Sequence, residues 1–179
     1  MVADIARFKG SKMASQTNQP REWIVRPGEV ADLPKIEPLW VALYEHEKEF
    51  GLELNIPPGA FKDWANAMKA LLGRKFACLF VADHKGKVIG FCGGWLKTLP
   101  PYHGGVPAGF LSEMYVDENY RSQGIGHILL ESGARFFYDQ GIERVEGQVL
   151  GNNVRAREAY KKWGWNEEYI KIIWHPSDG

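Results

Sequence analysis

The sequence predicts a single domain of the mixed α/β class, in the broad sense that includes α+β folds. The chain has 179 residues, a length typical of one domain that buries a substantial core. Apolar residues make up 45% of the chain and aromatic residues 13%, which is enough to build such a core. Strand-like and helical segments follow one another as strand, two helices, three strands, helix, strand, helix and strand.

The expected domain begins after a polar N-terminal segment. Residues 1–20 are rich in Ser, Gln, Asn and Lys and predict a mobile tail or an added extension, so the domain is expected at residues 21–176. Its expected strands are residues 23–26, 76–82, 88–96, 110–116, 144–150 and 169–175, and its expected helices are residues 33–50, 60–72, 124–140 and 153–163.

Caps and turn residues set the bounds of the first three elements. The first strand ends at Pro27-Gly28. Asp32 is a typical N-cap with Pro34 in the first turn, and apolar residues then recur at helical spacing until Gly51. The second helix carries one apolar face and ends at Gly73, because glycine readily adopts the conformation of a C-terminal cap.

Turn signals also separate the later elements. A polar turn at residues 83–87 joins two strands as a hairpin. Residues 99–109 hold three prolines and three glycines and are expected to form a loop. Gly124 opens the next helix, and Asn152 or Asn153 begins the last one.

Charge and apolar runs argue against several classes of protein. Lys and Arg total 22 and Asp and Glu total 22, so a nucleic-acid partner bound through bulk charge is not expected. No apolar run reaches the roughly 18 residues of a membrane span, and no secretory signal is recognised, so we expect no membrane partner and a cytoplasmic protein. Cys78 and Cys92 lie in apolar strand segments without nearby histidines, which predicts buried free thiols and no metal site.

A strand, a polar turn and a glycine-opened helix come together at residues 115–126. The first turn of a helix has unpaired N–H groups and a partial positive charge, which favour a phosphate. Gly124 and Gly126 leave room for a diphosphate, and Arg121 adds a full positive charge. The alternative is an ordinary strand-to-helix turn. ATP and NAD are poor candidates, since no Gly-Lys-Ser/Thr follows and the third glycine of a dinucleotide-binding fingerprint is missing.

Three short motifs resemble those of the GNAT N-acetyltransferase superfamily. That family's Gln/Arg-x-x-Gly-x-Gly/Ala motif is similar to Arg121-Ser122-Gln123-Gly124-Ile125-Gly126. Its fourth strand is similar to residues 111–116, and its Asn-x-x-Ala…Tyr…Gly-aromatic signature is similar to Asn153, Ala156, Tyr160 and Gly164-Trp165. The motifs occur in the family's element order, over residues 23–175.

The resemblance implies a fold and a ligand. A GNAT-like domain has a mixed, mostly antiparallel central sheet, flanked by helices and splayed between its fourth and fifth strands, with a β-bulge in the fourth. Acetyl-CoA is then the co-substrate, with its pantetheine arm in the splay, and no metal is implied. The implied cofactor-binding residues are Met114, Tyr115, Val116, Arg121, Ser122, Gln123, Gly124, Ile125, Gly126, His127, Asn153 and Ala156.

N-acetyl transfer also requires an acid, an oxyanion donor and a neutral amine. By resemblance, Tyr160 protonates the departing thiolate and the backbone N–H of Val116 stabilises the thioester oxygen. Tyr160 follows Asn153 by seven residues, so both face one side of a helix. The alternative is a core tyrosine packed under Trp163.

The base is left open between Glu113, Glu146 and water. In a regular strand Glu113 points to the opposite face from Ser112, but a bulge changes that direction. The direction of the Glu113 side chain therefore stays unassigned. A structural ion pair is the alternative role for Glu113. Glu146 lies on the fifth strand, where it could hold a water molecule.

The acceptor is expected to meet the first two helices, by resemblance. The acids there are Glu45, Glu47, Glu49 and Glu53, which suit a cationic amine, although a solvated helix face is the alternative. Residues 100–105 are a candidate lid. The expected function is acetyl-CoA-dependent transfer to a primary amine of a small molecule; the alternatives are a peptide or protein amine, or a non-catalytic acyl-CoA sensor. Homodimers are common among similar proteins, often through a C-terminal strand, so a homodimer is a further expectation.

Overall fold

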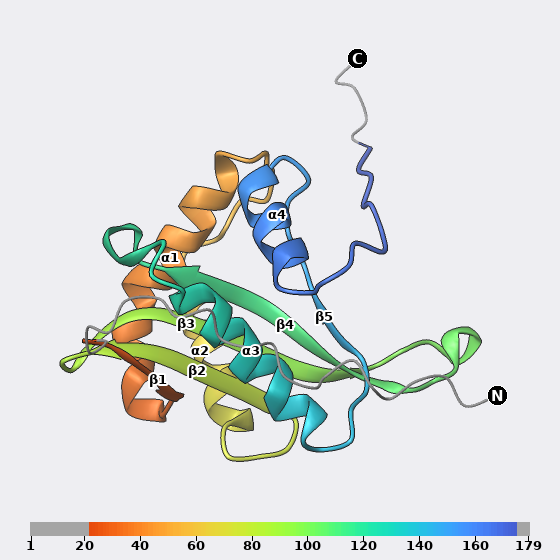
Figure 1. Ribbon diagram of the computed structural model, residues 1–179, viewed down its shortest axis with the longest axis horizontal. Coiled ribbons are helices and arrows are strands. Elements are labelled where there is room, and N and C mark those ends of the chain that lie inside the picture. Colours follow the sequence, from red (N-terminus) through yellow and green to blue (C-terminus); the bar gives the residue numbers. More distant parts are fainter. Residues whose placement is uncertain (1–21, 175–179) are drawn as a thin grey trace.

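The chain folds around one five-stranded sheet (Figure 1). The computed structural model describes residues 22–174, so the expected N-terminal tail and residues 21, 175 and 176 of the expected domain lie outside the described part. The strands are β1 (Ile24–Pro27), β2 (Ala77–His84), β3 (Lys87–Thr98), β4 (Pro107–Val116) and β5 (Val145–Gly147). The helices are α1 (Leu33–Lys48), α2 (Ala60–Leu71), α3 (Ile125–Tyr138) and α4 (Val154–Lys162), with short 3-10 helices η2 (Val30–Asp32), η3 (Pro101–His103) and η4 (Glu118–Tyr120). Within residues 22–174, no helix has the length and apolar character that a membrane crossing requires.

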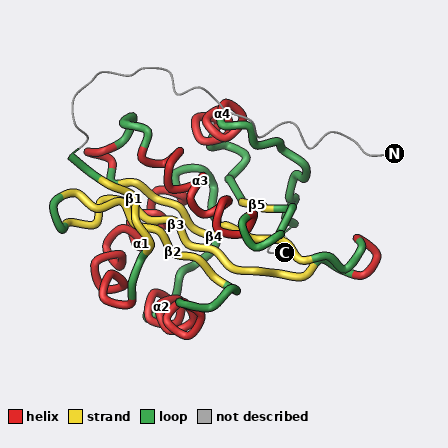
Figure 2. Tube along the Cα trace, turned by 60° about the horizontal axis from the view of Figure 1, so that its bottom comes forward, coloured by secondary structure: helices red, strands yellow, loops and turns green. Residues whose placement is uncertain are grey.

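Helices cover both faces of the sheet. The strands lie in the order β1-β2-β3-β4-β5; the first four pair antiparallel and β5 pairs parallel to β4. Figure 2 shows α1 and α2 on one face and α3 and α4 on the other. Each face buries its own core, one around Ile36 and one around Leu129, and Cys78 and Cys92 are buried free thiols. The expected mixed, mostly antiparallel sheet with flanking helices is confirmed.

The β2–β3 hairpin has a tighter turn than expected. Two residues, Lys85 (φ 53°) and Gly86 (φ 88°), connect the strands, where five turn residues were expected. Positive φ at both positions is what a two-residue type I′ turn requires, and the twist of that turn matches the twist of the strands. The carboxylate of Asp83 accepts a hydrogen bond from the N–H of Gly86 (2.7 Å), which stabilises the turn.

β4 contains a bulge that changes the direction of its side chains. Gly93 of β3 pairs with Glu113, and the next residue, Gly94, pairs with Leu111. Ser112 is therefore an extra residue on β4. Leu111 packs into the core under α3, whereas Glu113 lies on the face covered by α1 and α2. Regular alternation would have placed both on the same face.

β5 pairs along its whole length with three residues in the first half of β4. The parallel ladder joins residues 109–111 to Val145–Gly147 and ends there, so the two strands separate beyond Leu111. This confirms the splay. The expected strand at residues 144–150 is shorter in the structure because residues 148–150, past the point of separation, have no ladder on β4.

Two further expectations were wrong. The loop expected at residues 99–109 ends earlier, because residues 107–109 already pair with residues 96–98 of β3. The strand expected at residues 169–175 is absent from residues 169–174, and His175 lies outside the described part. A strand needs a neighbour for its backbone N–H and C=O groups. Figure 1 shows the segment after α4 running away from the sheet, so none of the described strands supplies that neighbour.

An ion-pair network joins β1 to the start of α1. Arg26 donates to both carboxylate oxygens of Asp32 (2.6 and 2.9 Å) and to Asp83 (2.9 Å). Asp32 occupies the N-cap position of α1, as expected, but its carboxylate does not cap that helix. It accepts instead from Arg26 and from the N–H of Glu29 (3.0 Å). The hydrogen bond from Arg26 holds the pKa of the buried Asp32 below its usual range.

Candidate active site

Consecutive backbone N–H groups are unpaired where β4 leads into α3. None of the six at residues 122–127 donates a well-formed hydrogen bond within the described chain; the first bond of the turn joins the Ile128 N–H to the Gly124 carbonyl (3.2 Å). Left-handed conformations at Ser122 (φ 65°) and Gly124 (φ 83°) are typical of turns whose successive N–H groups bind an anion. The buried Ile125 anchors the turn. A concave set of donors at a helix N-terminus binds phosphate; we call residues 122–127 the anion cradle.

Two arginines flank the anion cradle. Arg155 of α4 donates to the hydroxyl of Ser122 (3.3 Å), which brings a cation beside the cradle that the sequence analysis did not include. The sequence signal that could have identified Arg155 is its position two residues after Asn153, the first residue of the α4 motif. Arg121 donates its Nε–H to the Val116 carbonyl (3.1 Å), and its Cζ lies 5.2 Å from the centroid of the Tyr115 ring. Part of its guanidinium group therefore contacts β4.

The back of the anion cradle packs against β1, β4 and α4. The side-chain oxygen of Gln123 accepts a hydrogen bond from the indole of Trp23 (3.2 Å). A Cβ at Gly126 would lie 3.7 Å from Trp163 and 3.9 Å from side chains of β4, so the helix start fits closely there. The ring of His127 stacks on Trp163, with centroids 5.1 Å apart. These contacts hold the backbone donors in place.

The edge of β4 that borders the splay presents backbone donors and acceptors. The N–H of Asp117 donates to the carbonyl of Ile89 (2.9 Å), so the preceding pair, Val116 with Gly90, is of the non-hydrogen-bonded kind. The N–H and C=O groups of Val116, and by the same alternation those of Met114, therefore point away from β3 and into the splay. Past the short ladder with β5, this edge has no strand partner among residues 22–174.

Tyr160 is a buried phenol on α4. Its ring packs edge-on against Trp163, with centroids 5.9 Å apart. Burial raises the pKa of Tyr160 well above its usual range, and the charges of Cys92 and Glu47 add to the rise. The hydroxyl therefore stays protonated at neutral pH, as a general acid requires.

Glu113 is a buried carboxyl group, with 7% of its surface exposed. The Ser112 hydroxyl donates to it. Burial raises the pKa of Glu113; Ser112 and the nearby Trp64 indole oppose the rise, and the charge of Glu47 adds to it. No cation among the described residues pairs with Glu113, so the alternative of a structural ion pair finds no support.

Glu146, the other acid considered as a base, is occupied by two cations. Lys97 lies 2.5 Å from its carboxylate, and Arg144 donates to it. Partial burial raises the pKa of Glu146, but the hydrogen bonds and charges of Lys97 and Arg144 lower it overall. A proton taken up by Glu146 would disrupt both pairs, which makes Glu113 the better candidate base.

The start of α4 lies against the end of α1. The Asn153 side chain accepts from the N–H of Ala156 (3.0 Å) and caps α4. The preceding residue, Asn152, donates to the Phe50 carbonyl (3.3 Å). The last turns of α1 therefore border the splay, as Figure 1 shows. The expected lid, in contrast, projects past the far end of the sheet, and its Tyr102 side chain is 82% exposed.

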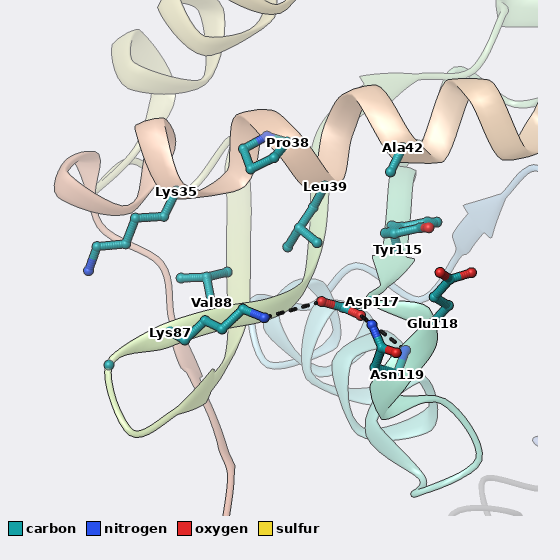
Figure 3. A pocket seen from close by; sticks show the side chains of 11 residues that line it. Lys35, Pro38, Leu39, Ala42, Lys87, Val88, Tyr115, Asp117, Glu118 and Asn119 are labelled. Carbon is teal, nitrogen blue, oxygen red and sulfur yellow. Dashed lines mark hydrogen bonds and ion pairs between the residues drawn. The ribbon is translucent and has the colours of Figure 1, made fainter.

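A separate cleft of about 740 Å³ lies between α1, the start of β3 and the turn after β4 (Figure 3). Its charged side chains are already paired in part, Lys87 with Asp117 (3.5 Å) and Lys35 with Asp32 (3.8 Å). None of residues 122–127 lines it, although Tyr115 does. The cleft and the anion cradle are therefore distinct features that meet at the end of β4.

Comparisons with known sequences point to one family. Residues 40–165 match the model of the Acetyltransferase (GNAT) family. The mycothiol acetyltransferase of Amycolatopsis mediterranei is 32% identical over 96 residues, 52% of this chain and 31% of that protein. An uncharacterised N-acetyltransferase of Methanocaldococcus jannaschii is 28% identical over 117 residues, 63% of this chain and 50% of that protein. The matched region thus spans about a third to a half of these curated relatives.

Solved structures share the fold. The aminoglycoside N-acetyltransferase AAC(6')-Iy in complex with CoA has a TM-score of 0.70 at 15% identity, over 90% of this chain and 99% of that one. An aminoglycoside acetyltransferase from an uncultured soil metagenomic sample has a TM-score of 0.63 at 22% identity, over 87% and 97%. Because the family model matches residues 40–165, from within α1 through every later element to the end of α4, the chain belongs to the acetyltransferase (GNAT) family.

Proposed function

We propose that this chain is an acetyl-CoA-dependent N-acetyltransferase that moves an acetyl group to a primary amine of a small molecule by direct attack on the thioester. The observation that carries the proposal is the anion cradle, whose six free N–H groups lie beside the splay between β4 and β5. The cradle suits a diphosphate. The backbone groups of Met114 and Val116 suit the amides of an extended arm. Coenzyme A combines both features and, when bound, supplies the acetyl thioester.

The proposed chemistry moves protons at separate atoms. The amine must lose a proton before it attacks, and we assign Glu113 to accept it, directly or through water. The N–H of Val116 is assigned to stabilise the charge that develops on the thioester oxygen. Tyr160 is assigned to protonate the departing sulfur. The buried Glu113 carboxyl group has no cation partner among the described residues and costs stability. This disfavours a sensor without catalysis, because such a protein has no use for this group.

The acceptor class is proposed from the names of the relatives. Those of the relatives compared above whose names state a substrate are named for small molecules, mycothiol and aminoglycosides. A peptide or protein amine remains the second candidate. The proposal also includes a homodimer, because the apolar segment at residues 169–174 is exposed and the outer edge of β5 has no described partner strand.

Thiol release from acetyl-CoA tests the reaction. The amine panel holds small primary amines, a peptide with a free N-terminal amine and a lysine peptide with a blocked N-terminus. We expect release with at least one small amine. Binding of CoA without turnover of any amine would contradict the enzymatic proposal and favour a sensor, and turnover of the peptides alone would favour the second candidate.

Substitution of Gly124 tests the anion cradle. A Cβ at Gly124 meets no protein atom within 4 Å, so a side chain there would project toward the ligand, and the left-handed backbone (φ 83°) would shift as well. Gly124→Val is expected to raise the Kd for CoA by at least about tenfold, the value of one charge-assisted hydrogen bond. Gly141→Val is the matched control, because Gly141 (φ 80°) is equally open and lies beyond the far end of α3. Equal CoA affinities of the two variants would refute the cradle assignment.

A further inference from the structure

Glu47 differs from the neighbouring acids at the end of α1. Glu45 pairs with Lys48 (2.7 Å), and Glu49 pairs with His46 (3.2 Å), both with exposed carboxylates. Glu47 is half-buried, and its side chain makes no hydrogen bond or ion pair with any residue of the described chain. A partly desolvated carboxylate without a cation is unfavourable, so its position is explained if a ligand supplies the cation.

Glu47 lies within electrostatic reach of both groups assigned to proton transfer. Burial raises the pKa of Tyr44 to about 12, and the charges of Glu113 and Glu47 add to the rise. Glu47 also adds to the raised pKa values of Glu113 and Tyr160, for which burial is the main cause. Glu47 is thus within electrostatic reach of Glu113, Tyr44 and Tyr160, and no cation is among the groups that shift the pKa of Glu47 or Glu113.

Aromatic rings of the core under α1 and α2 reach the Glu113 carboxylate. The rings that pack on one another, with centroids 4.4 to 6.3 Å apart, are Trp40, Tyr44, Phe61 and Trp64. A Cβ at Gly93 would lie 3.4 Å from Trp64 and 3.6 Å from the Glu113 carboxylate, so glycine leaves space where ring and acid meet. Ring faces attract ammonium groups, and the attraction grows when water is excluded. The Trp64 ring beside Glu113 therefore favours the same ligand charge as the two acids.

We infer that Glu47 binds the ammonium group of the acceptor and that Glu113 takes the proton from it, an inference that rests on the proposed function. The acceptor is then a cationic primary amine carried on an apolar or aromatic group. The bound ammonium gives one proton to Glu113, and the freed lone pair forms the C–N bond as the C–S bond of the thioester breaks. Tyr160 gives its proton to the leaving sulfur and regains one from the acylated nitrogen through solvent. Glu113 releases its proton to solvent, so each turnover liberates one proton.

The test compares Glu47→Gln with Glu45→Gln, a matched control two residues away whose carboxylate is exposed and paired with Lys48. Phenethylamine, which is charged at neutral pH, is titrated into the complex of the protein with CoA, and its KM is measured with acetyl-CoA. Glu47→Gln is expected to raise the Kd and KM of phenethylamine by roughly ten- to a hundredfold, the loss of one charge-assisted hydrogen bond. It should leave the Kd for CoA unchanged, and Glu45→Gln should leave all three values unchanged.

A second measurement needs no amine. Carbon-13 NMR of labelled glutamate follows the titration of Glu113, whose pKa should fall in Glu47→Gln and stay as in the wild type in Glu45→Gln. Equal behaviour of the two variants in both measurements, or a wild type that does not bind phenethylamine, would overturn the inference. Thiol release by the wild type with another amine would then leave the proposed function standing. A merely structural Glu47 would lower the Tm of the variant without a change in amine affinity, which also overturns the inference.

Discussion

Glu113 is a buried carboxyl group on β4, and its burial predicts how activity depends on pH. Burial raises its pKa, so it takes up a proton at a pH at which an exposed glutamate is still ionised. A base must be ionised, and kcat/KM is therefore expected to fall as the pH drops through this raised pKa. Glu113→Gln should remove the acid limb of the profile and lower kcat by about a hundredfold or more, as measured by rates across the pH range.

Glu146→Gln is the matched comparison for this experiment, because Glu146 is the other acid near the splay and is ion-paired. Its variant should keep the acid limb. Loss of the limb in Glu146→Gln and not in Glu113→Gln would transfer the role of base to Glu146. A limb that persists in both variants would leave water as the proton acceptor.

The same raised pKa predicts a change in stability. The pKa of Glu113 is higher in the folded than in the unfolded chain, so its stabilising contribution is fully present below the unfolded pKa and is lost as the pH rises through the folded pKa. Glutamine resembles the protonated carboxyl group. Glu113→Gln is therefore expected to match the wild type in acid and to exceed it in free energy of unfolding at neutral and higher pH, as measured with urea. An advantage that shrinks with rising pH would contradict the assignment.

The variant Tyr160→Phe separates the proposed role of Tyr160 as a general acid from its role in packing. The variant keeps the ring against Trp163 and removes only the hydroxyl. We expect kcat to fall by about a hundredfold, at the low end for general acids because a thiolate is a good leaving group. The Kd for CoA and the Tm should stay close to the wild-type values. An unchanged kcat would assign Tyr160 to the core alone.

At the residue scale, local chemistry was predictable and side-chain direction was not. Gly124 and Asn153 could be recognised because helix starts depend on neighbouring residues: one opens α3 and the other caps α4. The direction of Glu113 depends on a bulge that forms only in register with β3. Arg155 meets Ser122 only once α4 packs beside the start of α3. The half-burial of Glu47 likewise depends on the packed fold, and the sequence left it among four equivalent acids.

At the scale of elements, the Arg26 network predicts how strongly β1 is held. Asp32 is 3% exposed, and Arg26→Met would leave its buried carboxylate with only the N–H of Glu29 (3.0 Å) and the more distant Lys35 (3.8 Å). The free energy of unfolding is expected to fall by about 3 kcal/mol. Arg26 lowers the pKa of Asp32, so this stabilisation is present above the unfolded pKa and is lost as the pH falls through the folded pKa. Urea unfolding at neutral and acid pH measures both effects.

Arg135→Met is the control for that experiment. Arg135 lies 3.8 Å from Asp139 on the exposed face of α3, and both side chains are more than 60% exposed. Its removal is expected to cost about 0.5 kcal/mol or less. Equal losses in the two arginine variants would show that the network holds β1 no better than a surface pair.

Elements with local boundaries could be predicted, and elements bounded by a partner strand could not. All four helices lie within two residues of their expected bounds, because caps and apolar spacing act over a few residues. β5 ends at Gly147 because the ladder with β4 ends there. Residues 169–174 have side chains that favour a strand. β-propensity reflects how well side chains pack in a sheet, however, and it does not supply the partner strand that a sheet requires.

At the scale of the whole molecule, this uncovered segment predicts self-association. Its large apolar side chains, 63% to 91% exposed, are Tyr169, Ile170, Ile172, Ile173 and Trp174. The ion pair of Glu168 with Arg144 holds the start of the segment beside β5. The outer edge of β5 has no strand partner in the described part of the chain. An open edge and an apolar strand-forming segment in one chain complement each other, so two copies can exchange segments about a twofold axis.

We therefore expect a dimer, and the double variant Ile170→Lys, Ile172→Lys is expected to be a monomer. Burial of one isoleucine contributes about 1.5 to 3 kcal/mol, so loss of both weakens association by at least about a hundredfold. Light scattering during size exclusion at micromolar concentration measures the mass, and Val41→Lys, on the outer face of α1, is the control for an added charge at an exposed apolar position. A monomeric wild type or a dimeric double variant would contradict the exchange. The anion cradle and the proposed catalytic groups belong to one copy, so the monomer should keep its affinity for CoA.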